Sequence, residues 1–123
     1  MIAYKVLRMG ERGGLYSSNR GLPGAYKKNY RRKVRNHPRI EGTKLFVFSS
    51  LQSARNFNLN LHKCDIWEVE IPDNYEKADV IAELVDSFNL SNYWKGIRNY
   101  VTRSRKPPRG TLLVDWVRLV KPV

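Results

Sequence analysis

Hydrophobic residues alternate with polar ones, or run together over short stretches, in several segments whose pattern is typical of β-strands. We expect strands at residues 2–8, 15–17, 44–48, 65–71 and 111–120. In the strand at 65–71, Glu68 and Glu70 share one face, because alternate side chains of a strand point to the same side. The opposite face of this strand is apolar and predicts the core side.

A second spacing, typical of amphipathic helices, appears in the same half of the chain. Helices are expected after Ser49-Ser50, over residues 76–88 and after Ser91, with a serine suited to cap two of them. We therefore predict one α+β domain over residues 1–123. It would contain a small mixed or mainly antiparallel sheet of about five strands, covered by two or three helices.

Two segments interrupt this pattern with glycine, proline and many basic residues. Residues 18–43 are expected to form a long basic loop, with a helical turn around 26–34, and residues 103–110 a second basic loop. Loops as long as the first are uncommon in compact domains and are usually functional or disordered.

The distribution of charge supports a functional role for the basic segments, because positive and negative residues are concentrated in different parts of the chain. The formal net charge is +12, and it divides into +12 for residues 1–64, −7 for residues 65–90 and +7 for residues 91–123. No acidic residue lies between Glu11 and Glu41. Such an excess favours binding to nucleic acid or another polyanion.

Residues in the two basic loops are the candidates for nucleic-acid binding. They are Lys27, Lys28, Tyr30, Arg31, Arg32, Lys33, Arg35, Arg39, Arg103, Arg105, Lys106 and Arg109. The bases would neutralise phosphates, and the aromatic ring would stack on unpaired bases. We expect both loops to converge into one surface that binds RNA, DNA or a ribonucleoprotein. The alternative is that the charges only keep a face solvated.

Other classes of site find little support in the sequence. His62 and Cys64 are too few for structural zinc, so no metal site is expected. No glycine-rich phosphate-binding motif precedes a helix, and no cofactor is expected. A single cysteine favours a cytoplasmic protein, and no apolar run approaches the roughly 20 residues that span a bilayer, so no membrane partner is expected. The oligomeric state stays open.

The carboxylates of Glu68 and Glu70 offer two interpretations. Side chains two residues apart on a strand lie about 7 Å from each other, which suits acid–base chemistry or binding of a ribose. The alternative is that both line the solvent side of the strand and pair with a lysine or arginine from the neighbouring strand. We favour the second interpretation.

Four short motifs resemble a known group of proteins. They are Tyr4-Lys5-Val6, the stretch from Leu45 to Phe57, Trp67-Glu68-Val69-Glu70, and the stretch from Gly110 to Val117. Together they resemble small bacteriophage-encoded α+β domains with a reduced ADP-ribosyltransferase-like pattern. This resemblance implies a phage protein that acts on a host or defence complex.

The same resemblance implies an alternative function, a mono-ADP-ribosyltransferase or a related enzyme that cleaves NAD or a nucleotide. Arg8 would help to seat NAD, Tyr16 would support the nicotinamide, and Glu68 or Glu70 would stabilise the transition state. The chain departs from that family because it lacks the Ser-Thr-Ser motif. A third alternative is a protein–protein inhibitor that uses an acidic surface over residues 65–90.

Overall fold

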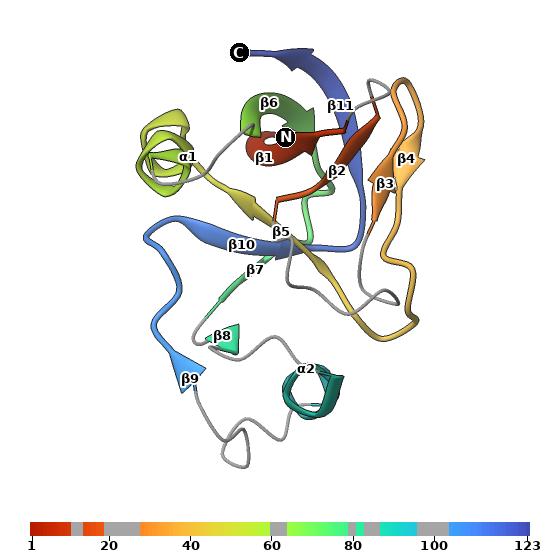
Figure 1. The fold of residues 1–123 in the computed structure, drawn as a ribbon, viewed down its shortest axis with the longest axis vertical. Helices are drawn as coiled ribbons and strands as arrows, with labels where there is room; N and C mark the ends of the chain where they lie inside the picture. The colour runs from red at the N-terminus through yellow and green to blue at the C-terminus, as the bar shows by residue number, and fades with distance from the viewer. Residues whose placement is uncertain (11–13, 19–27, 60–63, 79–80, 83–86, 96–103) are drawn as a thin grey trace.

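The computed structural model describes residues 1–10, 14–18, 28–59, 64–78, 81–82, 87–95 and 104–123 (Figure 1). Its strands are β1 (Ile2–Met9), β2 (Leu15–Ser17), β3 (Asn29–Tyr30), β4 (Arg35–Asn36), β5 (Leu45–Phe48), β6 (Cys64–Glu70), β7 (Glu76–Lys77), β8 (Ile81–Ala82), β9 (Ser104–Arg105), β10 (Thr111–Val114) and β11 (Val117–Pro122). Its helices are α1 (Leu51–Asn58) and α2 (Ser87–Trp94). No helix of the described residues is long and apolar enough to cross a membrane.

One antiparallel sheet of nine strands dominates the fold. Its strand order is β4-β11-β6-β1-β5-β10-β7, with β2 joined to β1 and β3 joined to β2. The centre is β1, which pairs with β6 from Ile2 opposite Glu70 to Arg8 opposite Cys64. Its other edge meets β5 at Tyr4 and β2 from Leu7 onward. The remaining strands, β8 and β9, form a separate two-stranded ladder.

The expected α+β fold with two or three helices is therefore wrong, since the described residues are mostly antiparallel sheet. The helix expected over 76–88 is the largest error, because β7 and β8 lie within that range. Glu76 and Lys77 pair with Leu113 and Leu112 of β10, more than thirty positions along the chain. Such ladder hydrogen bonds between distant segments override local helix propensity, which is worth less than about 1 kcal/mol per residue.

Three further elements differ from the expectations in their type or in where they begin and end. The helical turn expected around 26–34 is replaced, within the described residues, by β3 and the turn that follows it. The strand expected at 111–120 is divided at Asp115 into β10 and β11, which lie in different parts of the sheet. Ser91, expected to cap a helix, lies inside α2. Residues 96–102 of that expected helix lie outside the described residues.

Helix α1 forms where it was expected. The hydroxyl of Ser50 accepts a hydrogen bond from the backbone N–H of Ser53 at 3.1 Å, which caps the first turn. The helix buries Ala54 and places Phe57 with its ring centre 5.1 Å from that of Phe48. Together with Val6, these side chains form a small apolar cluster on one face of the sheet.

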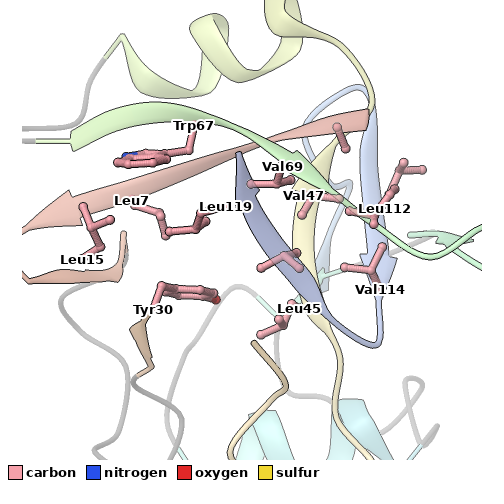
Figure 2. Packing of buried hydrophobic residues seen from close by; sticks show 13 residues of the cluster. Leu7, Leu15, Tyr30, Leu45, Val47, Trp67, Val69, Leu112, Val114 and Leu119 are labelled. Carbon is pink, nitrogen blue, oxygen red and sulfur yellow. The ribbon is translucent and has the colours of Figure 1, made fainter. Parts of the chain in front are cut away.

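The main core lies on the other face of the sheet. It gathers buried side chains from β1, β2, β3, β5, β6, β10 and β11, as Figure 2 shows for Leu7, Leu15, Tyr30 and Leu119 among others. Strands β2 and β3 and strand β11 attach to opposite sides of β1, yet their side chains share this cluster. The sheet therefore curls around its own core, as small barrel-like sheets do.

Candidate nucleic-acid interface

The tight turn between β3 and β4, called the β3–β4 hairpin below, carries the densest basic run of the described chain. Its two short strands pair with β2 and with β11 respectively, and Arg32 between them forms a bridge with Leu119 of β11. The shape of the hairpin depends on Asn36, which is only 4% exposed. The Asn36 side-chain carbonyl accepts from the backbone N–H of Arg31 at 2.8 Å, and its amide donates to the carbonyls of Arg31 and Val34 at 2.9 and 3.1 Å. A further bond, 3.2 Å long, joins the amide to the carbonyl of Val117 in β11. One buried side chain therefore closes the hairpin and fastens it to the sheet.

The closed hairpin directs its basic side chains outward. Arg31, Arg32, Lys33 and Arg35 are all exposed. Lys33 sits at φ 65°, in the left-handed region that a non-glycine residue seldom adopts outside tight turns. The hairpin thus presents four cations within five consecutive positions from a backbone held by hydrogen bonds.

Two of these arginines lie over tryptophan rings. The guanidinium of Arg35 is 4.1 Å from the ring centre of Trp116, and that of Arg32 is 5.2 Å from the ring centre of Trp67. Stacking of this kind contributes about 0.5–1 kcal/mol at exposed sites and holds the guanidinium plane in one orientation. The outer faces and edges of both guanidinium groups remain suited to phosphate or a base.

No salt bridge among the described residues neutralises the four hairpin cations. The positive charges also act on one another. Burial lowers the pKa of the Lys28 amine, and the nearby charges of Arg31 and Arg39 lower this pKa further. Lys28, Arg31 and Arg39 therefore lie close enough to produce a concentrated positive field, which an anion would relieve.

An ion pair lies next to the hairpin, on the strands β11 and β6. Arg35 faces Arg118 across the β4–β11 ladder, and Arg118 faces Glu70 across the β11–β6 ladder. The Arg118 guanidinium donates a hydrogen bond to the Glu70 carboxylate. Lys121 lies opposite Glu68 in the same ladder. Glu70 thus pairs with an arginine of the neighbouring strand, which is the interpretation that we favoured for the two carboxylates. Glu68 lies opposite a lysine of the same strand.

Tyr30 does not belong to this surface, although we predicted that it would. The side chain is 4% exposed and is part of the main core (Figure 2). Burial raises the pKa of its phenol above the ordinary value. Because an aromatic residue in a two-residue strand can face either way, only the position of β3 decides this burial.

The second basic segment lies elsewhere on the molecule. Lys106 and Arg109 are exposed and precede β10, whereas the hairpin borders β11. Four strands separate β4 from β10 in the sheet order, and Figure 1 places β3 and β4 on the opposite side from the β9–β10 connection. The expected single surface is therefore not formed by these residues. Lys27 and Arg103 lie outside the described residues, and Arg105 belongs to β9.

The residues named for the NAD-cleaving alternative are distributed over two places. Arg8 lies opposite Tyr16 in the β1–β2 ladder, with its guanidinium 5.2 Å from the centre of the tyrosine ring. Glu68 lies opposite Tyr4, four positions from Arg8 along β1, or about 13 Å. The Glu70 carboxylate is already bound to Arg118. The four candidates do not line one common site.

The acidic segment is also divided. Among the described residues, Glu70, Asp73 and Glu76 have their carboxylates within 4.0 Å of the Arg118 guanidinium, the N-terminal amine and the Lys44 amine respectively. Three carboxylates in the described part of this segment therefore have cationic partners. Within the described ranges, no group of three or more His, Cys, Asp or Glu side chains is arranged to hold a metal ion.

Sequence reasoning missed Asn36 and the two tryptophans. Asn36 stands one residue after Arg35, in a segment that reads as a polar loop, so nothing local distinguishes it from a solvent-exposed asparagine. Trp67 and Trp116 lie far from the hairpin in sequence, and the ladders of β11 bring them together with it. Their stacking on arginine is a tertiary feature.

Comparison with known proteins found no match: no family model fits the chain, and neither the curated proteins nor the solved structures gave a significant match. The resemblance to phage domains therefore stays a prediction.

Proposed function

We propose that this protein binds nucleic acid, RNA or DNA, alone or within a ribonucleoprotein, through the β3–β4 hairpin. The proposal rests on Arg31, Arg32, Lys33 and Arg35, which are exposed and have no ion-pair partner among the described residues. A rigid backbone holds them, so little conformational entropy is lost when they meet a ligand. Lys28 and Arg39 extend the positive field at the base of the hairpin.

The chemistry of the contacts follows from the side chains. Lys33 in the turn and Arg31 two residues before it suit phosphate oxygens, because each cation that replaces a condensed counterion adds a favourable entropy term. Arg32 and Arg35 are planar groups backed by indole rings, so they can stack on an unpaired base or donate paired hydrogen bonds to a phosphate. A short hairpin without a protruding helix favours single-stranded or irregular nucleic acid over readout of a duplex groove.

The test is a fluorescence anisotropy titration with a labelled single-stranded oligonucleotide over a range of salt concentrations. Each phosphate contact contributes about −0.7 to the slope of log K against log salt, so three or four contacts predict a slope of about −2 to −3. Replacing both Arg32 and Arg35 by glutamine is expected to weaken binding about tenfold or more and to flatten the slope.

The matched control removes two exposed bases elsewhere, with Arg55→Gln and Lys95→Gln in one chain. This variant has the same net charge as the hairpin variant, so a non-specific charge effect weakens both equally. Equal weakening, or a slope near zero for the wild-type protein, overturns the proposal.

We further propose a cytoplasmic site of action, supported by the single cysteine, Cys64. Action on a host or defence complex of a phage-infected cell is the form of this role that the sequence resemblance implies. Purification with and without nuclease treatment distinguishes direct binding to nucleic acid from binding to a protein partner.

A further inference from the structure

An open hollow of about 630 Å³ lies between the start of α1, β7 and the turn that precedes β10. Its cationic lining consists of Lys77, Lys106 and Arg109, and its hydroxyl lining includes Ser49, Ser50 and Ser53. None of the described residues that line it is acidic. The volume falls within the range of small-molecule sites, about 300–1,000 Å³.

The turn that carries Arg109 is rigid. The backbone N–H of Thr111 donates to the carbonyl of Pro108 at 3.2 Å, and Gly110 adopts φ 83°, which is the geometry of a type II turn. The carbonyl of Gly110 accepts from the backbone N–H of Ser49 at 2.8 Å, which ties the turn to the start of α1. A Cβ at Gly110 would lie 2.6 Å from the Ser53 hydroxyl, so turn and helix are in close contact.

A second hollow, of about 580 Å³, adjoins the first and shares Ser50, Ser53, Pro108 and Arg109 with it. Its other lining residues differ in chemistry. The Gln52 side-chain amide donates a hydrogen bond to the Asn56 side-chain carbonyl at 3.0 Å, so the Gln52 carbonyl and the Asn56 amide nitrogen are the groups that can accept from and donate to a ligand. Phe57 contributes an aromatic ring. Cations and hydroxyls therefore line one hollow, amides and an aromatic ring line the other, and Arg109 lies between them.

No salt bridge among the described residues involves Lys77, Lys106 or Arg109. Three positive charges around one hollow repel one another, and a phosphate dianion would remove this repulsion. The amides and the ring next to them suit the edge and face of a nucleobase.

We propose that the two adjoining hollows bind a mononucleotide. Its phosphate lies among Lys77, Lys106 and Arg109, and its base lies toward Gln52, Asn56 and Phe57. This site is separate from the hairpin and does not depend on it. The serine hydroxyls contribute hydrogen bonds, although the Ser50 hydroxyl already accepts from the N–H of Ser53 and donates to the Ser53 hydroxyl at 3.0 Å.

The experiment titrates the full chain with adenosine 5′-monophosphate, with adenosine and with inorganic phosphate, by calorimetry and by amide chemical shifts. We expect the monophosphate to bind at least about tenfold more tightly than either fragment, because only it fills both hollows. Amide shifts are expected at Ser53 and Gly110 and not at Arg31 or Asn36.

Two substitutions and one control distinguish the two halves of the site. Arg109→Gln is expected to weaken the monophosphate and inorganic phosphate alike, by about tenfold. Asn56→Ala is expected to weaken the monophosphate without changing inorganic phosphate. Arg55→Gln removes an exposed charge from α1 outside both hollows and is expected to leave all affinities unchanged.

Adenosine binding as tightly as its monophosphate, or equal affinities for Arg109→Gln and Arg55→Gln, overturns the proposal. So does inorganic phosphate binding as tightly as the monophosphate, since that result leaves the second hollow without a role. The Arg32→Gln and Arg35→Gln variant is expected to bind the monophosphate normally, so failure of either proposal leaves the other standing.

Discussion

The guanidinium of Arg35 lies 4.1 Å from the centre of the Trp116 ring, although the two residues are about eighty positions apart in the chain. The contact forms because β4 pairs with β11, which begins one residue after Trp116. A cation stacked in this way loses less freedom on binding than a solvated one. The indole ring therefore acts as a positioning group for the basic hairpin.

This relationship predicts an effect of Trp116 that does not depend on charge. Trp116→Ala is expected to weaken oligonucleotide binding about twofold to fivefold, since the guanidinium of Arg35 loses about 0.5–1 kcal/mol of stacking and becomes mobile. Trp116→Phe retains an aromatic face and is expected to retain most of the affinity. Anisotropy titrations at one salt concentration compare the two variants, and equal losses for both would contradict the positioning role.

Asn36 is expected to be the polar residue on which the hairpin most depends. Asn36→Ala removes four hydrogen bonds that involve buried or partly buried groups, and a loss of about 2–4 kcal/mol in the free energy of unfolding is expected. Urea denaturation measures this loss. Asn29→Ala is the matched control, because Asn29 is an exposed asparagine in the preceding strand of the same hairpin and is expected to change stability by less than about 0.5 kcal/mol. Comparable losses in both variants would show that Asn36 has no special role.

Because the Lys5 amine is buried, we expect the free energy of unfolding to depend on pH in an unusual way. Burial lowers the pKa of its amine from 10.5 to about 8, and the amine donates one 2.5 Å hydrogen bond, to the carbonyl of Phe46. Between these two pKa values the unfolded chain binds more protons than the folded chain, so this group makes stability rise as pH increases from about 8 toward 10.5. Below about pH 8 the buried, charged Lys5 amine lowers the free energy of unfolding by about 3 kcal/mol.

Tyr30 opposes this rise at the alkaline end. Burial raises the pKa of its phenol, so above the ordinary value of 10.0 the folded chain retains a proton that the unfolded chain loses, and stability falls. Urea denaturation between about pH 7 and about pH 11 is expected to show a maximum near about pH 10. Lys5→Met is expected to stabilise the protein at neutral pH and to abolish the rise. Lys95→Met, at an exposed position, is the control and is expected to preserve it.

Two glycines with nearly the same φ angle allow the cost of backbone strain to be measured apart from the cost of a steric clash. Gly42 and Gly110 adopt φ 82° and φ 83°, but a Cβ at Gly42 has no neighbour within 4 Å, whereas one at Gly110 meets the Ser53 hydroxyl at 2.6 Å. Gly42→Ala is expected to cost about 1 kcal/mol through backbone strain alone. Gly110→Ala is expected to cost about 1–3 kcal/mol more, because the turn and α1 must move apart. Thermal or urea denaturation gives both values, and equal losses would show that the contact with Ser53 yields at no cost.

The sequence alone determined the strands whose apolar pattern is strongest and the helix with a clear cap. Strands β1, β5 and β6 and the start of α1 at Ser50 follow from side-chain alternation and capping, which act between near neighbours in the chain. The sequence also determined the excess of positive charge and its concentration between Arg31 and Arg39. These features depend on composition and spacing, and a fold does not alter them.

Only the tertiary structure decided which polar and aromatic residues meet. The pairing of β7 with β10 replaced an expected helix, the position of β3 buried Tyr30, and the sheet order separated Lys106 and Arg109 from the hairpin. The stacking of Arg35 on Trp116 and the two hollows around Arg109 arise in the same way. Each depends on hydrogen bonds and packing between segments far apart in the chain, which local patterns of hydrophobic and polar residues do not encode.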